Sequence, residues 1–155
     1  MRLGAHSFAI MSARCHSEIT ARIVALLEPL EEVLEAYVFG SWTRGEDQPH
    51  SDIDIAVYID QAGLSDRGFG YRAELTSELM RALGTDRVDL VILNAAPPVL
   101  YHRVLRDGVR ILSRDLRKTT VREGRALSRY CDYVPQLKKI DAVLSVRVER
   151  GQFGQ

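Results

Sequence analysis

Two aspartates, Asp52 and Asp54, stand one residue apart at the start of an otherwise apolar run of the sequence. Side chains two positions apart in a β-strand project from the same face, so both carboxylates are expected to point the same way. Two like charges this close repel each other, and burying either one without a counter-charge costs free energy. A divalent metal such as magnesium, which binds carboxylate oxygens together with substrate phosphates, is the simplest compensation.

A third carboxylate, Asp89, interrupts the apolar stretch VDLVIL in the same way. Three strand-borne acids could hold two metal ions. The alternative interpretation is structural: Asp52 and Asp54 would lie on the solvated face of an edge strand, and Asp89 would pair with an arginine such as Arg87. The spacing of the acids leaves both interpretations open.

A Gly-Ser pair precedes the first aspartate, with ten residues between Ser41 and Asp52. Gly40 lets the backbone turn tightly at the end of a predicted strand, and the turn offers N–H groups and a hydroxyl to a phosphate. Phosphate and metal would then meet in one cleft. This favours the chemical interpretation of the acids over the structural one.

The hydrophobic periods alternate between helical and strand patterns, which predicts a mixed α/β fold. We expect helices over residues 17–28, with Ser17 as cap, over 66–83, over 97–108, and from 116 onward. We expect strands over residues 33–39, 51–59, 88–94 and, at a sheet edge, 109–112. Pro135 should kink or split the last helix. Ala56, on the aspartate face, is small enough to leave a cleft open, and the first 15 residues show no usable pattern.

The composition corresponds to one globular domain, because 155 residues with 46% hydrophobic content can bury a core without disulfides. Lys plus Arg and Asp plus Glu both number 21, so no overall positive field attracts nucleic acid or an anionic membrane. Cys15 and Cys131 are too few for a disulfide framework or zinc site and indicate reduced thiols. No apolar run reaches the roughly 18 residues of a membrane span, so we expect a soluble, cytoplasmic protein.

The run FGSWTRGEDQPHSDID, residues 39–54, resembles the GS-x10-DxD signature of the polymerase β-type nucleotidyltransferase superfamily, spacing included. Arg44-Gly45 and Ser51 are similar to the small branch called minimal nucleotidyltransferases, or MNT domains, which are antitoxins encoded beside HEPN-domain toxins. Trp42 and Thr43 stand where that branch often has Arg and Ala. His50 and Trp42 are weaker site candidates than the acids.

The resemblance implies a polymerase β-like nucleotidyltransferase fold, a small mixed sheet flanked by helices. It implies an N-terminal extension over residues 1–16, a nucleotidyltransferase domain over 17–115, and a C-terminal helical segment over 116–155 packed on the same domain. Tyr101, Tyr130 and Tyr133 are expected to be packing residues on their helices.

The resemblance also implies a magnesium-dependent transfer of AMP from ATP to a hydroxyl, with two metal ions. In this scheme Asp52 and Asp54 bridge the ions and Asp89 ligates the ion nearer the acceptor. The nucleotide and its phosphates are expected to contact Gly40, Ser41, Arg44 and Ser51.

The function implied is that of a protein adenylyltransferase antitoxin that modifies a hydroxyl, expected to be a tyrosine, of a HEPN ribonuclease toxin and forms a hetero-oligomer with it. No membrane and no direct nucleic-acid partner are expected. One alternative is an antitoxin that acts by binding alone. Another is a small-molecule nucleotidyltransferase of the aminoglycoside type, although such enzymes usually need a further domain for the antibiotic.

Overall fold

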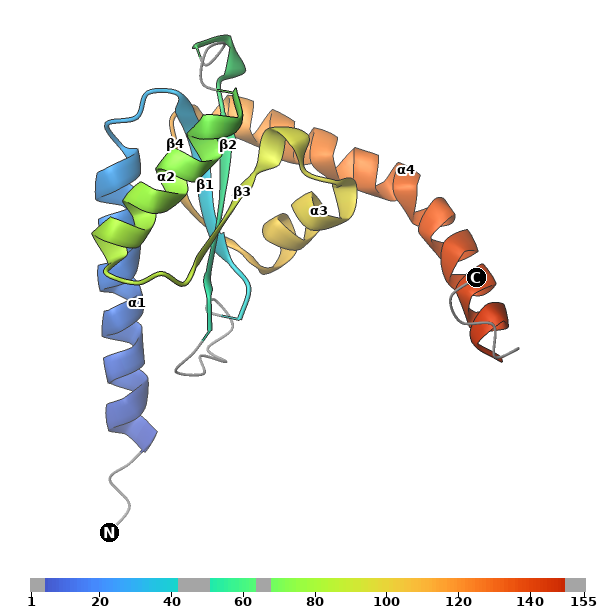
Figure 1. Ribbon diagram of the computed structural model, residues 1–155, viewed down its shortest axis with the longest axis horizontal. Helices are drawn as coiled ribbons and strands as arrows, with labels where there is room; N and C mark the ends of the chain where they lie inside the picture. The colour runs from blue at the N-terminus through green and yellow to red at the C-terminus, as the bar shows by residue number, and fades with distance from the viewer. Residues whose placement is uncertain (1–4, 42–50, 64–67, 150–155) are drawn as a thin grey trace.

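The computed structural model describes residues 5–41, 51–63 and 68–149 of the chain (Figure 1). The main elements are, in order, α1 (Ala5–Leu27), β1 (Val33–Phe39), β2 (Ile53–Ile59), α2 (Gly68–Leu83), β3 (Val88–Ile92), α3 (Pro98–Asp107), β4 (Val109–Ser113) and α4 (Leu116–Glu149). Two single 3-10 turns, η2 (Gln61–Gly63) and η3 (Leu93–Ala95), follow β2 and β3. The order of helices and strands confirms the predicted mixed α/β fold.

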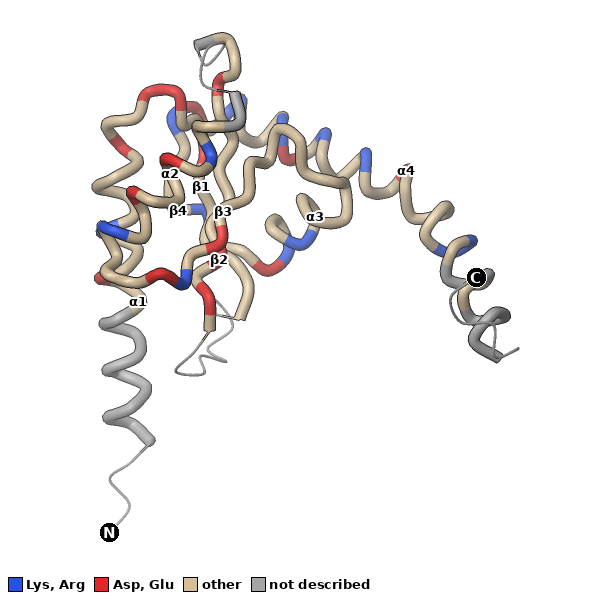
Figure 2. The backbone as a smooth tube through the Cα atoms, in the orientation of Figure 1, with Lys and Arg blue, Asp and Glu red and all other residues tan. Residues whose placement is uncertain are grey.

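The four strands form one mixed sheet in the order β3-β2-β1-β4. Strand β1 is antiparallel to both β2 and β4, whereas β2 and β3 run parallel. Strand β4 lies at an edge, as predicted, but β2 is an interior strand. The edge-strand interpretation of Asp52 and Asp54 is therefore wrong. Acidic positions are visible at the end of the sheet where β2 begins (Figure 2).

Both faces of the sheet are covered by helices, with α1 and α2 on one side and α3 and α4 on the other (Figure 1). Side chains of β2 alternate between the two faces of the sheet. On one face, Ile55 and Val57 pack with the buried side of α1 and α2. On the opposite face, Ala56 is fully buried with Tyr37 and Tyr101 in a second core cluster. The prediction that Ala56 leaves a cleft open is therefore wrong, while Tyr101 is a packing residue, as expected.

The helix boundaries agree with the sequence except at the start of α1. Helix α1 ends before Pro29 as predicted, but it begins at Ala5 and not at Ser17. The residues upstream of Ser17 contain no proline and no glycine after Gly4, so nothing local interrupts the helix there. Gly84 takes a φ of +69° after α2, the left-handed conformation that a glycine stop provides. The predicted cap of α2, Asp66, lies outside the described residues.

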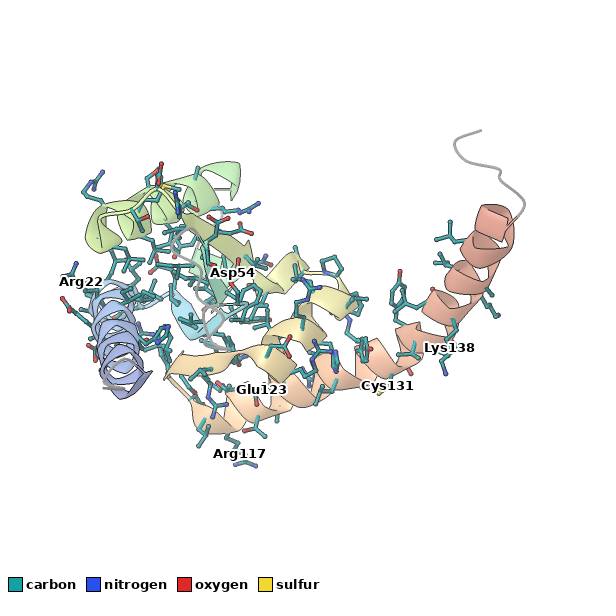
Figure 3. The ribbon with its side chains drawn as sticks, turned by 90° about the horizontal axis from the view of Figure 1, so that it is seen from below. Arg22, Asp54, Arg117, Glu123, Cys131 and Lys138 are labelled. Carbon is teal, nitrogen blue, oxygen red and sulfur yellow. The ribbon has the colours of Figure 1, made fainter. Side chains whose placement is uncertain are left out.

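Helix α4 is one continuous helix that contains Pro135. Proline removes a backbone N–H and its ring crowds the preceding turn, which bends a helix. The helix changes direction between the labelled Cys131 and Lys138 (Figure 3), so Pro135 kinks α4 without splitting it. The first half of α4 packs beside α3, and the second half extends beyond the domain (Figure 1). No helix in the described part of the chain is long and apolar enough to cross a membrane.

Candidate functional site

Gly40 ends β1 in a conformation that only glycine adopts readily. Its φ is +85°, in the left-handed region. A Cβ atom at this position would lie 2.9 Å from Cγ of Asp54, and the Oδ2 atom would lie closer still. Glycine is required twice, once for the turn and once for space. The Gly-Ser backbone is thereby held directly against a carboxylate of the neighbouring strand.

Asp54 and Asp89 are direct neighbours across the parallel pair β2 and β3. Partner residues on adjacent strands are roughly 4.8 Å apart, and they point to the same face of the sheet. Asp54 is half-buried and Asp89 is exposed. Figure 3 shows Asp54 on its strand, between the helices of the two layers. The structure therefore joins the predicted second and third acids at one end of the sheet, beside Gly40.

The other predicted site residues lie around this pair or outside the described residues. Asp52 is exposed and directly precedes β2. Ser41 and Ser51 are half-buried, and they stand immediately before and after residues 42–50, which lie outside the described residues. Arg44 lies outside the described residues, as do Trp42 and His50.

Arg72 of α2 is a neighbour of this site that the sequence did not indicate. Its Nε donates a hydrogen bond of 2.8 Å to the carbonyl oxygen of Leu90, and its Nη2 lies 3.5 Å from Oδ1 of Asp89. Asp89 does pair with an arginine, as one interpretation of the sequence predicted, but the partner is Arg72 and not Arg87. No spacing rule links positions 72 and 89, because the contact depends on how α2 packs along β3.

The comparison with known families decides the class of site. Residues 21–117 match the family described as polymerase beta, nucleotidyltransferase. The chain belongs to this family. The match contains the Gly-Ser turn and all three acids, which confirms the resemblance noted in residues 39–54.

The relatives of this nucleotidyltransferase include protein adenylyltransferases. MntA of Shewanella oneidensis, a protein adenylyltransferase, is 39% identical over 88 residues, which span 56% of this chain and 60% of MntA. A relative in Methanocaldococcus jannaschii, also named for protein adenylyltransferase activity, is 34% identical over 97 residues, 62% of this chain and 97% of the relative.

Solved structures of similar fold include toxin–antitoxin pairs. A toxin–antitoxin crystal structure with AMP-PNP has a TM-score of 0.67 and 30% identity, covering 81% of this chain and 98% of that chain. The complex of the tri-AMPylated Shewanella oneidensis HEPN toxin with an MNT antitoxin has a TM-score of 0.62 and 27% identity, covering 83% and 98%.

The nucleotidyltransferase family implies a divalent metal, and the carboxylates present fit one such ion. Among the described residues, no three His, Cys, Asp or Glu side chains come close enough together to hold a metal by themselves. Magnesium, however, commonly binds through one or two carboxylates and completes its shell with water and substrate phosphates. Asp54 and Asp89, neighbours across β2 and β3, would supply that donor set. The expectation of two ions depends on Asp52 as well and stays a prediction.

A buried network of charged and polar side chains joins α4 to β1, on the sheet face from which Asp54 and Asp89 also project. Glu35 of β1 is fully buried and accepts a hydrogen bond from Nε of Arg122. The hydroxyl of Tyr37 lies 3.1 Å from a Glu35 oxygen and 2.9 Å from Oε1 of Glu123. Burial, with the nearby charge of Glu35, raises the pKa of Tyr37 above its ordinary range. The Arg122 guanidinium also lies 4.9 Å from the ring centre of Tyr58.

The sequence analysis did not predict this network, although one residue of β1 indicated it. Glu35 interrupts the apolar strand VLEAYVF in the same way that Asp54 and Asp89 interrupt theirs. A carboxylate inside an apolar strand therefore indicates a buried counter-charge, and the sequence alone does not say whether that charge is a metal or an arginine. Here the positive charge comes from Arg122 and not from a metal ion, and the ion pair fixes α4 on the sheet.

Proposed function

We propose that this chain is a protein adenylyltransferase antitoxin that transfers AMP from ATP to a hydroxyl of a cognate HEPN ribonuclease toxin and thereby neutralises it. The observation that carries the proposal is the close approach of the Gly40 backbone to Asp54, which leaves no room for a Cβ, together with the pairing of Asp54 with Asp89. The similarity to MntA and to toxin–antitoxin complexes, one with AMP-PNP and one with an AMPylated toxin, supports it.

The Gly-Ser turn is the proposed site for the triphosphate. The left-handed Gly40 turns the backbone at the strand end so that N–H groups and the Ser41 hydroxyl are available to phosphate oxygens. Ser51, directly before Asp52 in the sequence, is assigned to the same phosphates. Arg44, whose guanidinium suits phosphate oxygens, is assigned there from its position in the sequence.

The acids are proposed to serve the transfer itself. The acceptor oxygen attacks the α-phosphorus, a new P–O bond forms, the bond to the bridging oxygen breaks, and pyrophosphate leaves. The acceptor proton passes to a nearby carboxylate, for which Asp89, the exposed acid beside Asp54, is the candidate. Magnesium, if held by these acids, would neutralise the charge that develops on the phosphate oxygens.

A protein hydroxyl is the proposed acceptor, with tyrosine as the expected residue. An added AMP carries negative charge, and placed near a ribonuclease site it repels the RNA phosphate that must bind there. Use of ATP and the exposed free thiol of Cys131 both favour action in the cytoplasm.

Intact mass spectrometry tests the function directly. The chain is incubated with ATP, magnesium and the HEPN protein encoded beside it, and the toxin should gain one or more AMP masses. Asp54→Asn, which preserves the shape of the side chain, should bind the toxin and add none. Neutralisation with no mass gain, equal in wild type and Asp54→Asn, would show instead an antitoxin that acts by binding alone.

A further inference from the structure

An apolar stripe runs along the second half of α4. Its members recur at alternating intervals of three and four residues, an average period typical of a helix that packs lengthwise against another helix. The stripe, named here the α4 docking face, consists of Tyr130, Tyr133, Leu137, Ile140 and Leu144.

The docking face continues the side of α4 that already packs on the domain. Upstream, Ala126 is only 5% exposed in the second core cluster, and the Tyr130 ring stacks on His102 with centroids 3.7 Å apart. Farther along, Ile140 and Leu144 are each 51% exposed. One side of a single helix thus changes from buried interface to exposed apolar surface as α4 leaves the domain (Figure 1).

A small pocket lies beside the part of α4 that packs on the domain. It has a volume of about 230 Å³ and is lined by Tyr37, Leu105, Gly108, Arg110, Glu123 and Leu127. This is below the roughly 300 to 1,000 Å³ of ordinary small-molecule sites. A pocket of this size suits one anchoring side chain of a protein partner.

The charges along the helix indicate which kind of partner fits. Between positions 125 and 144, the sequence of α4 contains four basic residues, Arg125, Arg129, Lys138 and Lys139, against two acids, Asp132 and Asp141. Basic positions are visible along α4 in Figure 2. A second copy of the chain would bring like charges together, whereas an amphipathic helix with acidic flanks would meet opposite ones.

We propose that the α4 docking face binds an amphipathic, acidic-flanked helix of the protein acceptor and so delivers that acceptor to the nucleotidyltransferase site. The inference rests on the proposed function in naming the HEPN toxin as that acceptor. The geometry fits delivery, because α4 covers the same face of the sheet from which Asp54 and Asp89 project.

The test uses one charge placed on either side of the helix in the full-length chain. Ile140→Asp puts a carboxylate in the docking face, and Ala142→Asp puts the same charge on an exposed position about 200° around the helix. Binding to the HEPN protein encoded beside the chain is measured by calorimetry without ATP, and circular dichroism checks that both variants remain helical. Ile140→Asp should raise the Kd by at least about 30-fold and Ala142→Asp by less than about threefold.

The outcomes separate docking from chemistry. At saturating toxin, Ile140→Asp should still transfer AMP, while Asp54→Asn should bind normally and transfer none. Wild-type affinity in Ile140→Asp overturns the docking proposal and leaves the function intact. Weakened binding without any transfer by the wild type overturns the function and supports docking. A wild-type chain that is dimeric alone, and monomeric as Ile140→Asp, would assign the face to a second copy and also overturn the proposal.

Discussion

Replacing Gly40 with alanine should inactivate this nucleotidyltransferase far more than it unfolds it. The first effect is backbone strain, because a left-handed φ of +85° costs a non-glycine residue about 1–2 kcal/mol. For a domain of this size, that lowers the Tm by roughly 2–8 °C. The protein should therefore remain folded at assay temperature.

The second effect falls on Asp54. The new Cβ would lie 2.9 Å from Cγ of Asp54, whereas ordinary contacts begin at 3.4 Å, and the Oδ2 atom would be closer. The carboxylate must therefore move by at least 0.5 Å, the difference between these values. Misplacement of a reacting group by about 1 Å can reduce a rate by about 100-fold, so AMP transfer should fall to about that extent.

Gly84 offers a matched control for the strain alone. Its φ is +69°, and a Cβ there meets nothing within 4 Å. Gly84→Ala should lose similar stability and keep its transfer rate. The assay pairs thermal denaturation with the rate of AMP gain on the toxin. Near wild-type transfer by Gly40→Ala, or an equal loss in both variants, would refute the reasoning that Gly40 makes room for Asp54.

Three other changes test the surroundings of the site. Arg72→Gln removes a competing positive charge from beside Asp89. It should lower the magnesium concentration for half-maximal activity by about two- to fivefold, which corresponds to the free energy of one exposed ion pair. An unchanged or higher magnesium requirement would contradict this. Arg122→Met leaves the buried Glu35 carboxylate unpaired and should cost about 3–5 kcal/mol in chemical denaturation. The exposed Arg125→Met should change stability by less than about 0.5 kcal/mol, and equal losses in the two variants would remove the ion pair from the account. Because the pKa of Tyr37 is raised on folding, its contribution is complete below the unfolded value of about 10 and is lost as pH rises above it, by up to about 1.4 kcal/mol per pH unit. Tyr37→Phe should make the fall in unfolding free energy above pH 10 less steep.

The sequence predicted the features that depend on local chemistry. Alternating isoleucines and valines located β2, and glycines and prolines located the ends of the helices, because these residues act on their own backbone. The joint position of Gly40, Asp54 and Asp89 followed from the family resemblance, and the structure places them together at one end of the sheet. Their catalytic roles remain predictions.

The features that the sequence did not predict depend on contacts between distant segments. The start of α1 could not be located from Ser17, because a serine that can cap a helix can also lie inside one. Arg72 reaches Asp89 only through the packing of α2 along β3. Glu35 and Arg122 are 87 residues apart, so no local pattern relates them.

The most direct test of the central claim compares chemical modification with loss of toxin activity. The toxin is incubated with the chain, ATP and magnesium, then separated from the chain under denaturing conditions, refolded and assayed as a ribonuclease. The account predicts that the fraction of activity lost equals the fraction of toxin carrying AMP, and that Asp54→Asn produces neither. A separated toxin that is fully active although it carries AMP, or inactive with no added mass, would contradict it.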